Sequence, residues 1–154
     1  MNKEKVLFYF IIFWTLIIWI NSLLPGDLSS VQSGLVTNIF QDIFNFIGFY
    51  PDPLTLSSII RTIAHGVEFM ILGFLVHLYF KVNPFKVIYL LTLGLGVALV
   101  DEIIQIFIPS RAFEFKDLVV DTLGYLLGLF LIYYIFKIKK TKKDRTLEEI
   151  NESW

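Results

Sequence analysis

Ionisable side chains recur at regular spacing inside an otherwise apolar part of this sequence. Arg61, His65 and Glu68 stand at positions i, i+4 and i+7. On an α-helix with 3.6 residues per turn, side chains so spaced share one face. A histidine beside a carboxylate can act as a general acid and base, and both groups can also bind a divalent cation. The spacing predicts a polar site, and it leaves acid–base chemistry and metal binding open as alternatives.

Two later stretches carry polar faces of the same kind. Asp101, Glu102 and Gln105 occupy neighbouring turns of one expected helix, and Asp117 and Asp121 stand four residues apart on the next. Ionisable residues are costly within a membrane and by default mark a functional site there. The sequence therefore predicts three helices that each turn one polar face toward the others.

The composition places these faces in a membrane protein. Of 154 residues, 56% are hydrophobic and 17% aromatic, and the mean hydropathy is +0.70. Cysteine is absent, so disulfides and thiolate metal sites are excluded. The net charge of −1 gives no indication of nucleic-acid binding. We expect membrane lipids as partners and no nucleic acid.

Four stretches are long and apolar enough to cross a hydrocarbon core, which needs about 20 residues. They are residues 6–24, 59–80, 85–108 and 118–136. Lipid offers no partner for backbone N–H and C=O groups, so spanning segments of this length must be helical. The predicted fold is an all-α integral membrane protein with four transmembrane helices.

Small residues in the last two spans predict close helix packing. Gly124 and Gly128 are four residues apart, and Gly94, Gly96 and Ala98 thin one side of the preceding span. The short connections between the second, third and fourth spans indicate that consecutive spans are antiparallel neighbours.

The distribution of basic residues predicts the orientation of the spans, since Lys and Arg near span ends favour the cytoplasm. They precede the first span, separate the second from the third and crowd the tail, whereas residues 26–58 contain none. We predict cytoplasmic termini, with a four-helix membrane domain over residues 1–136 and a charged cytosolic tail over 137–154. Residues 26–58 then lie outside.

That outer loop has its own periodicity. Leu35, Ile39, Ile43, Phe46 and Ile47 recur at helical spacing among polar residues. The pattern predicts an amphipathic helix lying at the outer membrane interface. A lid or spacer on the lipid surface is the favoured interpretation, and a guide for a lipid-like substrate is the alternative.

The predicted topology brings the polar faces to one depth. Glu68 lies ~13 Å from the outer end of its span, and Asp101 lies ~10 Å from the outer end of the next, at 1.5 Å per residue. Asp121 is about one turn into the last span. All three therefore fall within the outer half of the bilayer, where Arg111 from the following outer loop can reach them.

Charge balance leaves several explanations open. Two arginines and one histidine cannot offset five carboxylates, so protonation, a bound cation or a cationic substrate group must compensate the excess. A structural network of ion pairs is a further alternative. Our cation hypothesis uses Glu68, Asp101 and Asp121. We expect acid–base or metal chemistry from His65, Glu68, Asp101, Glu102 and Asp121. Two arginines suit bidentate capture of a phosphate or carboxylate, and the expected substrate contacts are Arg61, Gln105, Arg111 and Asp117.

These motifs resemble the VanZ-like family, membrane proteins named for a teicoplanin resistance determinant. The resemblance runs from about Ser22 to Gly128. It is carried by Ala64-His-Gly-Val-Glu-Phe69 after a basic residue, by Asp101-Glu-Ile-Ile-Gln105, by Pro109-Ser-Arg111 and by Asp117-Leu-Val-Val-Asp121. Ile104 stands where many relatives have His, and Ser110 where Gly is usual.

The resemblance implies a bacterial plasma membrane and an association with glycopeptide or lipoglycopeptide resistance and the cell envelope. We expect a site in the outer leaflet that acts on, or binds, an amphiphilic envelope molecule. A membrane-embedded hydrolase or transferase on a lipid-linked substrate is one alternative. A non-catalytic protein that binds a lipid or lipoglycopeptide and shields the envelope is the other. A transporter subunit is disfavoured because no inverted repeat is evident.

Overall fold

A computed structural model of the chain describes the backbone of residues 2–82, 87–109 and 111–152 and, within them, the side chains of 2–25, 34–81, 88–109 and 111–141. This part of the chain forms five α-helices and no strand, so the predicted all-α fold is confirmed. The helices are α1 (Lys3–Ser22), α2 (Gly26–Phe46), α3 (Pro53–Val82), α4 (Val87–Ile106) and α5 (Phe115–Glu152).

Within the described residues, four of these helices are long and apolar enough to cross a membrane, namely α1, α3, α4 and α5. Large apolar side chains on them point away from the bundle, as with Phe13 at 58% and Phe130 at 67% exposed. Outward apolar surface of this extent needs lipid around it. The chain is a multi-pass membrane protein.

The helices extend beyond the predicted spans where polar residues allow it. α3 begins at Pro53 because proline suits the first helical position, and the Asp52 carboxylate accepts hydrogen bonds from the Thr55 backbone N–H and hydroxyl, both at 2.8 Å. These bonds hold the pKa of Asp52 below its ordinary value. α5 continues past the predicted span end to Glu152, so the last span and most of the tail are one helix.

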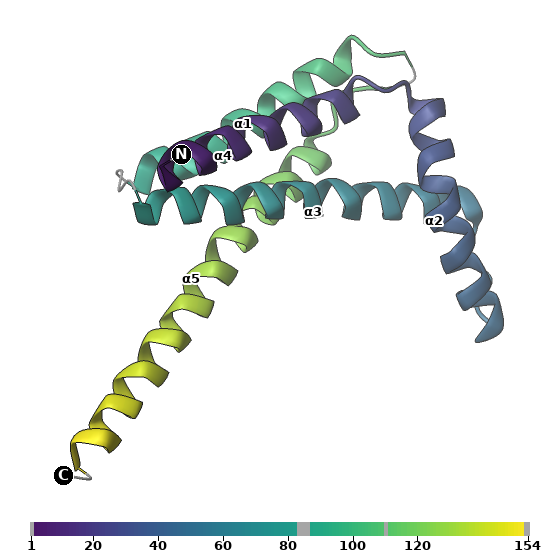
Figure 1. Cartoon of the computed structure of the whole chain (residues 1–154). Coiled ribbons are helices and arrows are strands. Elements are labelled where there is room, and N and C mark those ends of the chain that lie inside the picture. Colours follow the sequence, from purple (N-terminus) through teal and green to yellow (C-terminus); the bar gives the residue numbers. More distant parts are fainter. Residues whose placement is uncertain (1, 83–86, 110, 153–154) are drawn as a thin grey trace.

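The predicted amphipathic helix is present as α2, which follows the end of α1 and contacts α3 near the N-terminal end of α3 (Figure 1). Its apolar face is not packed against the bundle, since Leu35, Ile39 and Phe46 are 76%, 60% and 92% exposed. Gly48 ends the helix with a φ of 80°, a conformation that glycine adopts without strain. An uncovered apolar face is what a helix at a lipid interface presents.

The closest packing joins α3 and α5, and the N-terminal part of α5 crosses α3 near the middle of α3 (Figure 1). A Cβ on Gly124 would lie 2.2 Å from the Gly66 carbonyl oxygen, and one on Gly128 would lie 2.0 Å from that of Met70. The predicted packing role of these two glycines is confirmed. Spans that follow one another in the sequence pack less extensively than α3 and α5 do. A short loop only keeps two helix ends near each other, whereas glycines let two helix backbones approach closely along their length.

Helix α4 packs against α5 through Tyr125. Its ring lies where a Cβ on Gly94 would be, and its hydroxyl donates a 2.7 Å hydrogen bond to the Leu90 carbonyl oxygen. The same packing role predicted for Gly96 is wrong, because a Cβ there would meet no atom within 4 Å. The core around this contact includes the buried side chains of Ile18, Phe69, Leu72 and Ala98.

Candidate functional site

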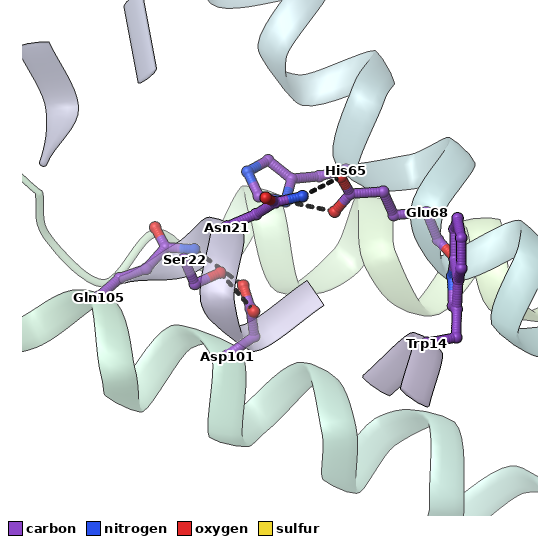
Figure 2. Close-up of polar contacts among 7 residues, drawn as sticks. All are labelled: Trp14, Asn21, Ser22, His65, Glu68, Asp101 and Gln105. Carbon is purple, nitrogen blue, oxygen red and sulfur yellow. Dashed lines mark hydrogen bonds and ion pairs between the residues drawn. The ribbon is translucent and has the colours of Figure 1, made fainter. Parts of the chain in front are cut away.

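Glu68 on α3 is held by the C-terminal half of α1 (Figure 2). The Asn21 side-chain amide donates to Glu68 Oε1 at 2.7 Å, and the Trp14 indole N–H donates to the Glu68 backbone carbonyl at 2.9 Å. On α3 itself, His65 Nδ1 lies 3.8 Å from Glu68 Oε2. The structure thus brings His65 and Glu68 together, as their spacing predicts.

Asp101 on α4 is fully buried and has a donor for each carboxylate oxygen (Figure 2). The Ser22 hydroxyl donates a short hydrogen bond to Oδ1, and the Gln105 side-chain amide donates to Oδ2 at 2.9 Å. Ser22 is itself completely buried. Asp101 is therefore fixed between the end of α1 and the next turn of α4.

Three side chains of α1, those of Trp14, Asn21 and Ser22, also belong to the site and were not among its predicted members. Asn21 donates a hydrogen bond to the Glu68 carboxylate, and Ser22 donates one to the Asp101 carboxylate. Trp14 donates a third hydrogen bond, to the backbone carbonyl of Glu68. A signal was available, because two adjacent polar residues end an apolar span at the depth where acidic residues of other spans need donors.

Asp101, Glu102 and Asp121 converge in the bundle interior. One oxygen from each carboxylate lies within 4.8 Å of the others, the one such group of three metal-binding side chains found among the described residues. All three side chains are buried, at 0%, 0% and 1% exposure. Glu68, which the cation hypothesis paired with Asp101 and Asp121, is not part of this group, and Glu102 is in it instead.

This carboxylate cluster (Asp101, Glu102 and Asp121) has unused acceptors. Glu102 Oε2 accepts a 2.9 Å hydrogen bond from the Glu114 backbone N–H. Glu102 Oε1 and Asp121 Oδ1 are buried and have no hydrogen-bond partner in the described part of the chain. Buried polar atoms are almost always satisfied, so these two oxygens indicate a missing proton, ion or ligand.

A polar pocket of about 260 Å³ opens beside the cluster. All four side chains expected to contact substrate line it; its lining residues are Arg61, Gln105, Arg111, Ala112, Glu114 and Asp117. We call it the arginine pocket. Gln105 joins it to the buried layer, since the same side chain lines the pocket and donates to Asp101.

Neither arginine of the pocket forms an ion pair with a carboxylate among the residues whose side chains are described, and Arg111 Nε is buried without a hydrogen-bond partner. Partial burial, followed by the nearby charge of Arg61, lowers the pKa of Arg111 from its ordinary value. The negative charges of Asp101, Asp117 and Glu102 offset part of this effect. An anion in the pocket would favour both guanidinium groups.

A larger pocket of about 360 Å³ lies at the opposite end of the bundle, between α1, α3 and α4. Apolar and aromatic side chains line it, including Phe8, Val76 and Leu93. It has no carboxylate, histidine, lysine or arginine in its lining, so among the described residues the carboxylate cluster and the arginine pocket are the better candidates for acid–base or ion-binding chemistry.

Comparison with known protein families finds a matching family model. The family model described as VanZ/LLP1 matches residues 7–137, which include α1 through the membrane-spanning part of α5 and every residue of the site. Comparison with curated proteins and with solved structures finds no significant match. Because the family model covers most of its length, the chain belongs to the VanZ/LLP1 family.

Proposed function

We propose that this protein binds the anionic group of an amphiphilic cell-envelope molecule in the arginine pocket and acts on it with the neighbouring acid–base groups. It does so at the outer leaflet of a bacterial plasma membrane, in the setting of glycopeptide or lipoglycopeptide resistance. The reaction class is hydrolysis or group transfer on a lipid-linked substrate.

The observation that carries this proposal is that Arg61 and Arg111 line one pocket and that neither forms an ion pair with a carboxylate whose side chain is described. Guanidinium groups present forked donors that match phosphate and carboxylate oxygens. Two such groups facing the same space repel each other until an anion enters. A phosphate or carboxylate head group supplies that anion.

The membrane setting favours an amphiphile over a soluble anion. Positive charge is absent from residues 26–58 and abundant in the tail, which supports cytoplasmic termini and an outer site. α2 follows Ser22 at the site's end of α1 and exposes its apolar face. A lipid-like molecule can then keep its chains in the bilayer while its head group enters the pocket.

Chemistry on the bound group would come from His65 and Glu68. His65 Nδ1 and Glu68 Oε2 lie 3.8 Å apart, beyond hydrogen-bond distance, and neither has a hydrogen-bond partner among the described residues, so both atoms are free to exchange a proton with a bound group. The Asn21 amide orients the carboxylate. Gln105 fixes Asp101 between this pair and the pocket. A positioned acid–base pair beside an anchored phosphate or ester is the arrangement that hydrolysis or transfer requires.

Pure binding is the alternative, and one observation favours it. Both Asp101 oxygens already accept hydrogen bonds from side chains, so this carboxylate is committed to holding the bundle together. In that case the protein shields the envelope by sequestering a lipid or lipoglycopeptide, and the arginines suffice.

The test uses teicoplanin susceptibility in a sensitive bacterium that expresses the protein. If the proposal holds, wild type raises the inhibitory concentration, and Arg61→Gln, Arg111→Gln, His65→Gln and Glu68→Gln each abolish the rise. Lys140→Gln, which removes an exposed positive charge outside the site, is the control and retains it. If the arginine variants alone lose the effect, the protein binds without catalysis. Full resistance in both arginine variants, at wild-type protein levels, refutes the pocket.

A direct measurement complements the cellular test. Purified protein in detergent should bind short-chain phosphatidic acid and not the matching diacylglycerol, which lacks the phosphate. Arg111→Gln should weaken binding at least tenfold, since a charge-assisted bidentate contact is worth about 1.5–3 kcal/mol. Equal affinity for the two lipids would show that the pocket does not recognise an anion.

A further inference from the structure

We propose that Asp101, Glu102 and Asp121 form a binding site for one hard divalent cation, of the Ca²⁺, Mg²⁺ or Mn²⁺ class. This inference stands apart from the anion recognition proposed for the arginine pocket and does not depend on it. It differs from the ligand set expected from the sequence, because Glu102 replaces Glu68.

Geometry is the first support. The three oxygens lie within 4.8 Å of one another. Two ligands on opposite sides of a Ca²⁺ ion lie about 4.6–5.2 Å apart, and on opposite sides of Mg²⁺ about 4.0–4.2 Å apart, at the usual metal–oxygen distances. One ion can therefore contact all three carboxylates from the space between them.

The unpartnered oxygens are the second and independent support. Glu102 and Asp121 are 0% and 1% exposed, yet Glu102 Oε1 and Asp121 Oδ1 have no hydrogen-bond partner among the described residues. Asp101, by comparison, has both oxygens occupied. If hydrogen bonds alone stabilised the cluster, these two oxygens of Glu102 and Asp121 should have donors as well. A cation satisfies both free oxygens at once.

Ligand chemistry selects the class of ion. The cluster offers oxygen only, and neither His65 nor His77 belongs to it. Carboxylate oxygens suit Ca²⁺, Mg²⁺ and Mn²⁺, whereas Zn²⁺ sites usually include nitrogen or sulfur. Three carboxylates around a divalent ion leave one negative charge, which the Arg111 side chain near the cluster reduces further.

The cation would also order the edge of the arginine pocket. Glu102 links the cluster to the loop that carries Arg111, since its other oxygen accepts a hydrogen bond from the Glu114 backbone N–H. Residues 111–114 connect this bond to the guanidinium of Arg111. Holding Glu102 therefore fixes the segment that presents Arg111.

The test is equilibrium dialysis of the purified full chain in detergent, stripped with chelator, against ⁴⁵Ca²⁺ and with Mg²⁺ and Mn²⁺ as competitors. Wild type should bind one ion per chain and melt at a higher temperature when the ion is present. Asp121→Asn and Glu102→Gln should each weaken binding at least tenfold. Asp42→Asn makes the same chemical change on an exposed residue of α2 and should bind as wild type does.

Two further outcomes overturn the proposal. If none of the three ions binds wild type stoichiometrically, and chelated protein gains stability as the pH falls, shared protons compensate the cluster. If Glu68→Gln abolishes binding while Glu102→Gln does not, the ligand set is wrong. The measurement of ion binding by wild type requires no variant. Asn and Gln also preserve the shape of the side chains that they replace. If one variant misfolds, the wild type and the other variant therefore still decide the question.

Discussion

The crossing of α3 and α5 requires that Gly124 and Gly128 have no side chain. A Cβ on Gly128 would lie 2.0 Å from the Met70 carbonyl oxygen, and one on Gly124 would lie 2.2 Å from that of Gly66. Ordinary carbon–oxygen contacts are no closer than about 3.3 Å. Backbone atoms cannot rotate aside, so alanine at either position must push the two helices apart by ~1 Å.

The cost follows from that displacement. A gap of 0.5–1 Å forfeits roughly a quarter to a half of the dispersion energy of each contact it opens. Overpacking of this kind costs about 1–3 kcal/mol, while alanine gains about 0.5–1 kcal/mol over glycine inside a helix. The difference between the two ranges leaves a net loss of up to about 2.5 kcal/mol in the free energy of unfolding of Gly128→Ala.

Titration with SDS in mixed micelles measures this free energy, and other glycines supply a graded control. Gly96→Ala places its Cβ where no atom lies within 4 Å, so it should match or exceed wild type in stability. Gly66→Ala meets a Val120 methyl at 3.2 Å, which can shift, and should fall between the two. If Gly128→Ala proves as stable as Gly96→Ala, α3 and α5 do not cross at these residues.

Three further predictions concern the site and the topology. Ser22→Ala should destabilise the protein by about 1–3 kcal/mol in the same titration, because it leaves a buried oxygen of Asp101 without its donor. Tyr125→Phe should cost only about 0.5–1.5 kcal/mol, because it removes one neutral hydrogen bond and keeps the ring; a larger loss would mean that the hydroxyl does more than bond to α4. The chain has no cysteine, so Tyr50→Cys and Lys140→Cys can be labelled without background, and an impermeant reagent added to intact cells should modify the first and not the second. The reverse pattern would invert the proposed orientation.

The sequence alone predicted the membrane-spanning helices well, because length and apolarity are sufficient signals for a segment in lipid. Helix ends were less predictable. Hydropathy marks where the chain leaves the bilayer, whereas a helix ends where its hydrogen bonds end, and α5 continues through charged residues to Glu152. The start of α3 was readable after all, since Asp52 followed by Pro53 is a helix-start signal.

The sequence indicated which polar residues of α3, α4 and α5 face the bundle interior, but it did not indicate which of their side chains lie next to each other. Helical spacing placed Arg61, His65 and Glu68 on one face, but it carries no information on how helices rotate against each other. That rotation depends on contacts such as Gly124 against Gly66, and it turns Glu102 rather than Glu68 into the carboxylate cluster. Asn21 and Ser22 were recognisable as polar residues at the end of an apolar span, but the sequence does not identify the carboxylates that they contact.

The order in which the helices emerge during synthesis has a consequence for how the polar residues enter the membrane. α1 is made before α3 and carries Asn21 and Trp14, so Glu68 meets its hydrogen-bond donors as soon as its own helix inserts. Asp121 is synthesised last of the site residues, on α5. Until α5 inserts, α3 lacks the helix against which it packs most extensively. A chain halted after α4 would thus expose to lipid the face of α3 that contains Gly66 and Met70, and quality-control proteases should clear it before a full-length chain.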